Sequence, residues 1–170
     1  MIEKIELFNL LIKGVIKLQN EGKKFETDFI RSVPKDWFHY RLNDSSSSWS
    51  SGEKARFTPS NICDFIVYNS TLWLLELKSH KGKSIPFSCI RPKQVEGLMD
   101  AYTKKVNAGY IINFRDIEET YFVYADAIHV FMKNETRKSI PLIWIKETGV
   151  LIPQTKKKVR YNYDLKFMEN

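Results

Sequence analysis

Residues 62–68 (ICDFIVY) and residues 72–77 (LWLLEL), separated by the tripeptide NST, decide the fold of this chain. Both runs are rich in β-branched and aromatic residues, which favour strands, and the residues between them are of the types that form turns. The two runs are therefore predicted to form an antiparallel hairpin with a three-residue loop. Centring that loop on Ser70 pairs Tyr68 with Leu72.

The same register brings three ionisable side chains together. It places Asp64 opposite Glu76, and because side chains alternate between faces with a period of two, Lys78 shares the face of Glu76. Directly opposed residues have Cβ atoms about 4.5–5.5 Å apart. Two carboxylates at this spacing are close enough to share one cation.

The hairpin is apolar on both of its faces, which is typical of strands covered on both sides of a sheet. Asp64, Glu76 and Lys78 therefore form a charged cluster at one end of a largely buried sheet. Adjacent carboxylates repel each other, and a bound divalent cation would relieve that repulsion. The alternative interpretation is an ordinary glutamate–lysine ion pair at a solvated strand end, because an acid followed by Glu-x-Lys is a common chance match.

The composition narrows the class of protein. The 170 residues suit one domain, and a net charge of +7 points to an anionic partner, usually nucleic acid. Two cysteines make no disulfide framework, which favours reduced thiols in the cytoplasm, and no Cys/His cluster suggests zinc. Neither a secretory signal nor an apolar run long enough for a membrane is visible, and no glycine-rich loop suggests a small-molecule cofactor.

Periodicity predicts the other elements. Helices are expected over residues 2–18, 24–33 and 92–108, with Gly109 closing the last, and a short helix over residues 126–132. Strands are expected over residues 37–42, 110–114 and 120–124, with a strand or extended segment over residues 140–145. The first helix could serve core packing or dimer contacts, and the basic residues 156–160 could be a solvated tail or a phosphate contact.

Residues 43–61 (NDSSSSWSSGEKARFTPSN) differ from the rest in composition. Serine, glycine and proline predict a loop here, which we expect to be mobile over residues 45–60. Its basic and aromatic residues, among them Lys54 and Arg56, suit insertion against DNA. A plain surface loop is the alternative.

Several segments together resemble the RecU-type Holliday junction resolvases. Residues 20–26 (NEGKKFE) resemble the opening N-x-G-x-x-F-E element of that family, and Cys63-Asp64-Phe65 and Glu76-Leu77-Lys78 resemble its second motif and its E-x-K. Further similar pieces are Pro92 to Glu96, Lys138 to Pro141 and Tyr161 to Leu165. The broader likeness is to PD-(D/E)xK nucleases. The chain departs from the family pattern with Cys63 in place of the usual threonine and with its serine-rich loop.

The resemblance implies an α/β fold with a restriction-endonuclease-like core, in which helices flank a mixed β-sheet. Residues 1–170 would form a single nuclease domain, with residues 1–19 a helix-like N-terminal segment and residues 45–60 a projecting stalk. It also implies a homodimer that nicks four-way DNA junctions in recombination and repair, in the cytoplasm of a bacterial cell and encoded by host or phage.

The resemblance also suggests roles for individual residues. Asp64 and Glu76 would ligate Mg²⁺, or Mn²⁺ in its place, with the Leu77 carbonyl as a further ligand. Lys78 would orient a water or stabilise charge on the phosphate. Glu26 would complete the site as a ligand or through water, and Gln94 would position water or phosphate. The candidate contacts to DNA phosphates are Lys54, Arg56, Lys81, Lys83, Arg91, Lys93, Lys156, Lys157 and Lys158.

Three other hypotheses compete with a structure-selective endonuclease. The same core could belong to a restriction-like or repair endonuclease acting on linear DNA. The chain could also be a DNA-binding protein without catalysis, although the presence of Glu26, Asp64, Glu76 and Lys78 argues against that. A basic protein that binds no DNA is the last alternative.

Overall fold

The computed structural model describes residues 21–42 and 61–169 and centres on a six-stranded mixed sheet in the order β1-β2-β3-β5-β6-β8. Only β3 and β5 pair in parallel within it, and the other neighbours are antiparallel. The strands of the sheet are β1 (Phe38–Arg41), β2 (Phe65–Tyr68), β3 (Leu72–His80), β5 (Asn107–Phe114), β6 (Glu119–Tyr124) and β8 (Val150–Ile152). The expected N-terminal helix and the loop over residues 45–60, with Lys54 and Arg56, lie outside the described residues.

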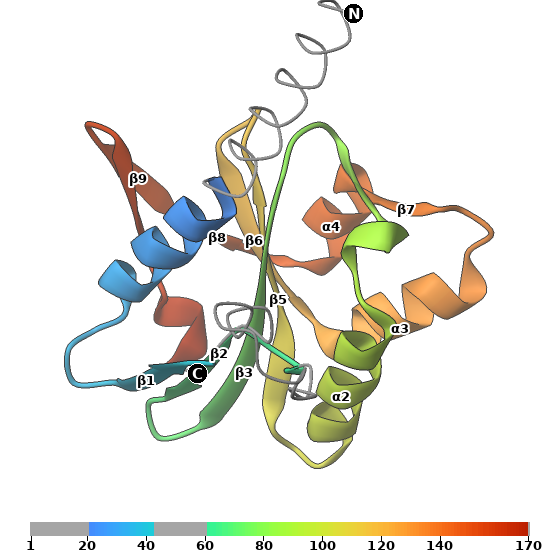
Figure 1. Ribbon diagram of the computed structural model, residues 1–170, viewed down its shortest axis with the longest axis horizontal. Coiled ribbons are helices and arrows are strands. Elements are labelled where there is room, and N and C mark those ends of the chain that lie inside the picture. The colour runs from blue at the N-terminus through green and yellow to red at the C-terminus, as the bar shows by residue number, and fades with distance from the viewer. Residues whose placement is uncertain (1–20, 43–60, 170) are drawn as a thin grey trace, which may run out of the picture.

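Helices cover both faces of this sheet. Residues 21–32 are helical and lie on one side of the sheet, and α2 (Pro92–Thr103), α3 (Ala125–Asn134) and α4 (Leu142–Thr148) lie on the other (Figure 1). Phe25 and Phe29 of the first helix pack in one core with Phe65, whereas Leu98 of α2 packs in the second core with Tyr110. The predicted α/β fold, a mixed sheet flanked by helices, is confirmed.

Two short antiparallel sheets complete the described structure. They are β4 (Ser84–Pro86) with β7 (Ser139–Pro141), and β9 (Gln154–Lys157) with β10 (Arg160–Tyr163). Short 3-10 turns span Phe87–Cys89 and Lys166–Met168. The basic segment 156–160 is therefore not a tail: it comprises the end of β9, the turn and the first residue of β10, with Lys158 at a φ of 57°.

The register predicted for the central hairpin is confirmed where Phe65–Tyr68 pairs with Leu72–Leu75, whereas the ladder ends before the expected Asp64–Glu76 pair. Tyr68 pairs with Leu72 and Ile66 with Leu74, and Ser70 has a φ of 97° in the turn between them. The second strand runs to His80, beyond its expected end at residue 77, because β5 pairs with it in parallel along that length.

The turn end of the hairpin is more exposed to solvent than we expected. Tyr68 and Leu72 were expected inside a sheet covered on both sides, yet they are 52% and 40% exposed. The helices of the second layer pack over β5 and β6, which leaves this corner open. Both cysteines are free, with Cys63 buried and Cys89 exposed.

Three expected boundaries are wrong. The helix α2 ends at Thr103, because Lys105 takes a left-handed conformation with a φ of 67°. Gly109 lies within β5 rather than after a helix, and an added Cβ there would lie 2.4 Å from the Val123 carbonyl oxygen, so close strand packing requires glycine. Residues 142–145 are the start of α4, which follows Pro141. The short helix begins at Ala125, with Asp126 inside its first turn.

Candidate functional site

Asp64 directly precedes β2, and its carboxylate binds the β3 backbone just beyond the point where the two strands stop pairing. Its backbone N–H donates to the Leu75 carbonyl at 3.0 Å, and its Oδ2 accepts a hydrogen bond from the Leu77 N–H at 2.8 Å. The Phe65–Leu75 pair ends the β2–β3 ladder, so the Leu77 N–H on that edge takes a side-chain partner instead. The N–H and C=O of one strand residue point to the same edge, so the Leu77 carbonyl also faces Asp64.

Glu76 and Lys78 come from the middle of β3, where the sheet is buried. The Glu76 side chain is 3% exposed, and its Oε1 accepts a hydrogen bond from Lys78 Nζ at 2.7 Å. Lys78 Nζ also donates to Oε1 of Gln94 at 3.3 Å. Gln94 is buried in the first turn of α2, which places it over the same end of the sheet. The structure thus brings four of the predicted catalytic residues together.

The two carboxylates are electrostatically unfavourable neighbours. Burial and the nearby charge of Glu76 raise the pKa of Asp64 to about 6. Burial also raises the pKa of Glu76, although the charge of Lys78 opposes that rise. Two buried acids, one of which also has its pKa raised by the charge of the other, favour a shared cation once both are ionised.

Two buried polar atoms beside these acids lack a hydrogen-bond partner among the described residues. They are Oε2 of Glu76 and the hydroxyl of Tyr110, which is the residue paired with Glu76 on β5. A buried carboxylate oxygen without a donor requires an explanation, and an oxygen-liganded cation supplies one. The donor set of Asp64, Glu76 and the Leu77 carbonyl therefore fits a divalent metal. Within residues 21–42 and 61–169, no three or more His, Cys, Asp or Glu side chains form a metal cluster.

Glu26 is held by an arginine that the sequence analysis missed. Arg41, the last residue of β1, contacts Glu26 Oε2 through Nε and Nη2, both at 2.8 Å. The charge of Arg41 also lowers the pKa of Asp64, so this arginine lies between the helix and the acids. Glu26 is thus connected to the site through Arg41 and is not assembled with Asp64 and Glu76 into one cluster of acids.

The predicted DNA-contacting side chains that the structure describes are all exposed. Arg91 is the N-cap residue of α2, and its charge lowers the pKa of Glu76, so it lies at the site. Near the ends of β3 and α2 lie Lys81, Lys83 and Lys93, all exposed. The β9–β10 hairpin carries Lys156, Lys157 and Lys158.

A mixed sheet flanked by helices, with two acids and a lysine gathered where its hairpin meets a helix, is the arrangement expected for a nuclease with a restriction-endonuclease-like core. The family model described as "RecU: Recombination protein U" matches residues 17–168, and the chain belongs to this family. The resemblance inferred from the motifs is confirmed. As a member of this family of Holliday junction resolvases, the protein is an endonuclease of recombination that acts on branched DNA with a divalent metal.

The comparisons also find similar individual proteins. The chain is 30% identical, over 163 residues, to the SPβ prophage-derived uncharacterized protein YotM of Bacillus subtilis (strain 168); the match covers 86% of this chain and 83% of that protein. Among solved structures, the Holliday junction resolvase Hjc of Archaeoglobus fulgidus aligns at 16% identity with a TM-score of 0.45, covering 68% of this chain and 82% of that one. No helix in the described part of the chain is both long and apolar enough to cross a bilayer.

Proposed function

We propose that the protein is a Mg²⁺-dependent crossover junction endodeoxyribonuclease that resolves four-way junctions by paired nicks. The observation that carries this proposal is the buried set of Asp64, Glu76, Lys78 and Gln94, in which one carboxylate oxygen lacks any described partner. A buried acid pair beside a lysine is unfavourable for folding alone and suits hydrolysis of a phosphodiester.

The residues divide the chemistry between them. Asp64 and Oε2 of Glu76 would hold the metal, with the Leu77 carbonyl as a further oxygen, and Mn²⁺ could replace Mg²⁺ there. The bound metal would acidify a water for in-line attack and neutralise charge on the phosphate. Lys78, kept in place by Glu76 Oε1 and Gln94 Oε1, would stabilise the negative charge that develops on the scissile phosphate.

Glu26 would act at the edge of the site. Because it is paired with Arg41, its proposed role is to orient that guanidinium toward the DNA phosphate and to reach the metal through water. Arg91 would add a second positive charge next to Glu76. These contacts would recognise the DNA backbone without reading its sequence.

Paired nicks require two sites related by symmetry, so we propose a homodimer. The exposed aromatic side chains of Phe38, Tyr40 and Tyr68 on the outer strands of the sheet support this, because they form an apolar surface that a second copy could cover. We propose one nuclease domain over residues 1–170, with residues 45–60 as the stalk that enters the junction. Similarity to a prophage-derived protein supports a phage-encoded enzyme acting in the bacterial cytoplasm.

A cleavage assay on a labelled four-way junction tests the proposal. Wild-type protein should make symmetric nicks with Mg²⁺ and none with EDTA. The Asp64→Asn and Glu76→Gln variants should be inactive, whereas Glu96→Gln, an exposed acid on α2, should retain wild-type activity. An intact junction across Mg²⁺ and Mn²⁺ concentrations would refute the proposal, and equal cleavage of linear duplex would favour a restriction-like or repair nuclease.

A further inference from the structure

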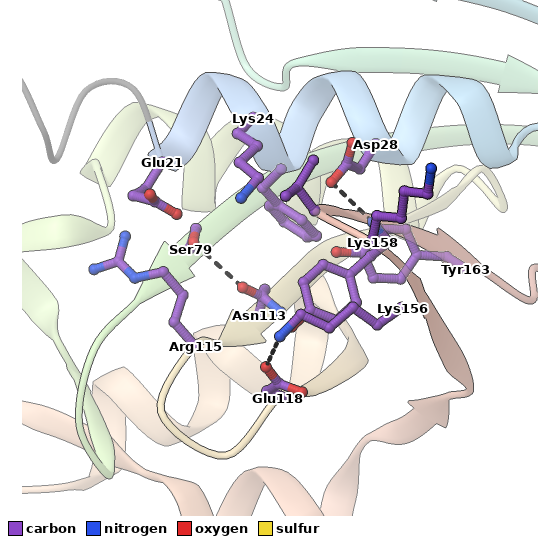
Figure 2. A pocket seen from close by; sticks show the side chains of 13 residues that line it. Glu21, Lys24, Asp28, Ser79, Asn113, Arg115, Glu118, Lys156, Lys158 and Tyr163 are labelled. Atoms are coloured by element: carbon purple, nitrogen blue, oxygen red, sulfur yellow. Dashed lines mark hydrogen bonds and ion pairs between the residues drawn. The ribbon is translucent and has the colours of Figure 1, made fainter.

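A polar cavity of about 260 Å³ lies between the helix over residues 21–32, the ends of β3 and β5, and the β9–β10 hairpin. Figure 2 shows side chains from these elements gathered around it. The lining residues that matter here are Glu21, Lys24, Ser79, Asn113, Arg115 and Lys158. The cavity is not lined by any of the four grouped catalytic candidates, which are Asp64, Glu76, Lys78 and Gln94.

The cavity and the catalytic set lie on opposite faces of one strand end. Ser79 pairs with Asn113, one position beyond Lys78, and consecutive side chains of a strand point to opposite faces. Lys78 therefore points toward α2, and Ser79 points toward the first helix. The two Cα atoms are about 3.8 Å apart, so a polymer that crosses this end of the sheet would reach both sites.

Positive charge around the cavity exceeds negative charge once the ion pairs are assigned. Asp28 is occupied by Arg160 Nη1 at 3.2 Å and by the Tyr161 N–H at 3.1 Å, and Glu118 is occupied by Lys156 at 2.5 Å.

Three further cations line the same opening, and among the described residues they form no ion pair. They are Lys24, Arg115 and Lys158, from the helix, the β5–β6 turn and the β9–β10 turn. Glu21 is the one lining acid in the described part of the chain for which no ion pair is formed. Three cations that line one hollow repel one another, and an anion would relieve that repulsion.

The floor of the cavity is held rigidly. The Ser79 hydroxyl donates to Asn113 Oδ1 at 3.3 Å, Asn113 Nδ2 donates to Thr120 Oγ1 at 2.9 Å, and the Thr120 hydroxyl donates to Gln154 Oε1 at 2.6 Å. This chain fixes the amide of Asn113 and joins β3, β5, β6 and β9. A polar floor that is fixed in advance lowers the ordering cost of binding a polar ligand.

We propose that this cavity binds a phosphate group of the DNA backbone other than the scissile one, held by Lys24, Arg115 and Lys158. The inference rests on the proposed function, since it assigns a second contact to the same substrate. A DNA strand that leaves the catalytic face would pass over the end of β3 and place a phosphate between the three cations. Glu21 would weaken this binding and keep the contact reversible.

Binding of a fluorescent four-way junction in EDTA, measured by anisotropy, tests the assignment without cleavage. Arg115→Gln and Lys158→Gln should each weaken binding several-fold and lower the slope of log affinity against log salt by about 0.9. Glu21→Gln should change affinity in the opposite direction, which a merely structural role would not produce. Arg115→Lys should bind nearly as wild type, and Lys133→Gln on the exposed part of α3 is the matched control.

The outcomes separate this inference from the proposed function. If wild-type protein cleaves junctions but the Arg115→Gln and Lys158→Gln variants bind like Lys133→Gln, the cavity assignment is wrong and the nuclease proposal stands. If the wild-type protein binds without cleaving and these variants lose affinity, the assignment stands and the nuclease proposal fails. Calorimetric uptake of inorganic phosphate, with DNA affinity unchanged in the variants, would show a free anion as the ligand and overturn the DNA assignment.

Discussion

Replacing Asp64 with asparagine should stabilise the metal-free protein while it removes cleavage. At pH 8 the carboxylate is ionised although the fold raises its pKa from 3.8 to about 6, mainly through burial and then through Glu76. That rise corresponds to about 3 kcal/mol against the folded state, which partial exposure reduces to about 1–2 kcal/mol. The replacing amide can still accept from the Leu77 N–H through its oxygen.

The expected gain is a rise in melting temperature of roughly 2–8 °C, given the usual 2–4 °C per kcal/mol for a chain of this size. Thermal unfolding followed by circular dichroism in EDTA would measure it. Because the folded-state pKa of Asp64 is raised, its ionisation costs stability as pH increases. The advantage of the variant should therefore be absent below about pH 4, grow up to about pH 6 and level off above.

Two controls make this prediction decisive. Glu96→Gln, on the exposed face of α2, should change the melting temperature little, since surface substitutions stay within about 0.5 kcal/mol. Mg²⁺ should raise the melting temperature of the wild type and leave that of Asp64→Asn nearly unchanged. Equal or lower stability of Asp64→Asn at pH 8 without metal would show that burial and Glu76 do not destabilise the ionised Asp64 carboxylate, and the cation argument would lose its basis.

Three further predictions follow from the same geometry. Lys78→Met leaves the buried Glu76 carboxylate without its ion-pair partner and should cost about 3 kcal/mol in urea unfolding, while Lys78→Met combined with Glu76→Gln should recover most of that loss. Gly109→Ala places a Cβ 2.4 Å from the Val123 carbonyl oxygen, and should lower the urea midpoint by the equivalent of about 1–3 kcal/mol. Mg²⁺ affinity, measured by calorimetry, should fall as pH drops through about 6, because protonated Asp64 cannot ligate; affinity independent of pH from 5 to 8 would contradict Asp64 as a ligand.

The sequence predicted the central hairpin and most elements correctly, but it placed several helix and strand boundaries wrongly. The hairpin register followed from a three-residue loop and strand alternation, both of which act between neighbouring residues. The end of α2 was misplaced because Gly109 is equally suited to a helix terminus and to close packing within a strand. Residues 142–145 were apolar enough for a strand, and the pairing of β7 with β4, far away in the chain, decided where the strand stops.

Within the site, too, residues joined by a local turn could be predicted and residues joined by tertiary packing could not. Asp64, Glu76 and Lys78 could be grouped from the sequence because one tight turn separates them. Gln94 could be proposed from motif resemblance, but its contact with Lys78 depends on how α2 packs. The sequence could not identify Arg41 as part of the site. Its strand, β1, pairs with β2, but residues 43–61 separate the two strands in the chain, and no local pattern predicts a pairing over that distance.

The amino-acid sequence by itself determined the central hairpin, the acidic pair with its lysine and the likeness to a recombination nuclease family, because these depend on residues adjacent in the chain or on motif order. Tertiary structure alone decided that Arg41 holds Glu26, that Tyr110 lies beside Glu76, and that Lys24, Arg115 and Lys158 surround one cavity. Each of those contacts joins elements whose neighbourhood is set by strand order and helix packing. Burial and charge balance over the whole fold select that order, and no local pattern encodes it.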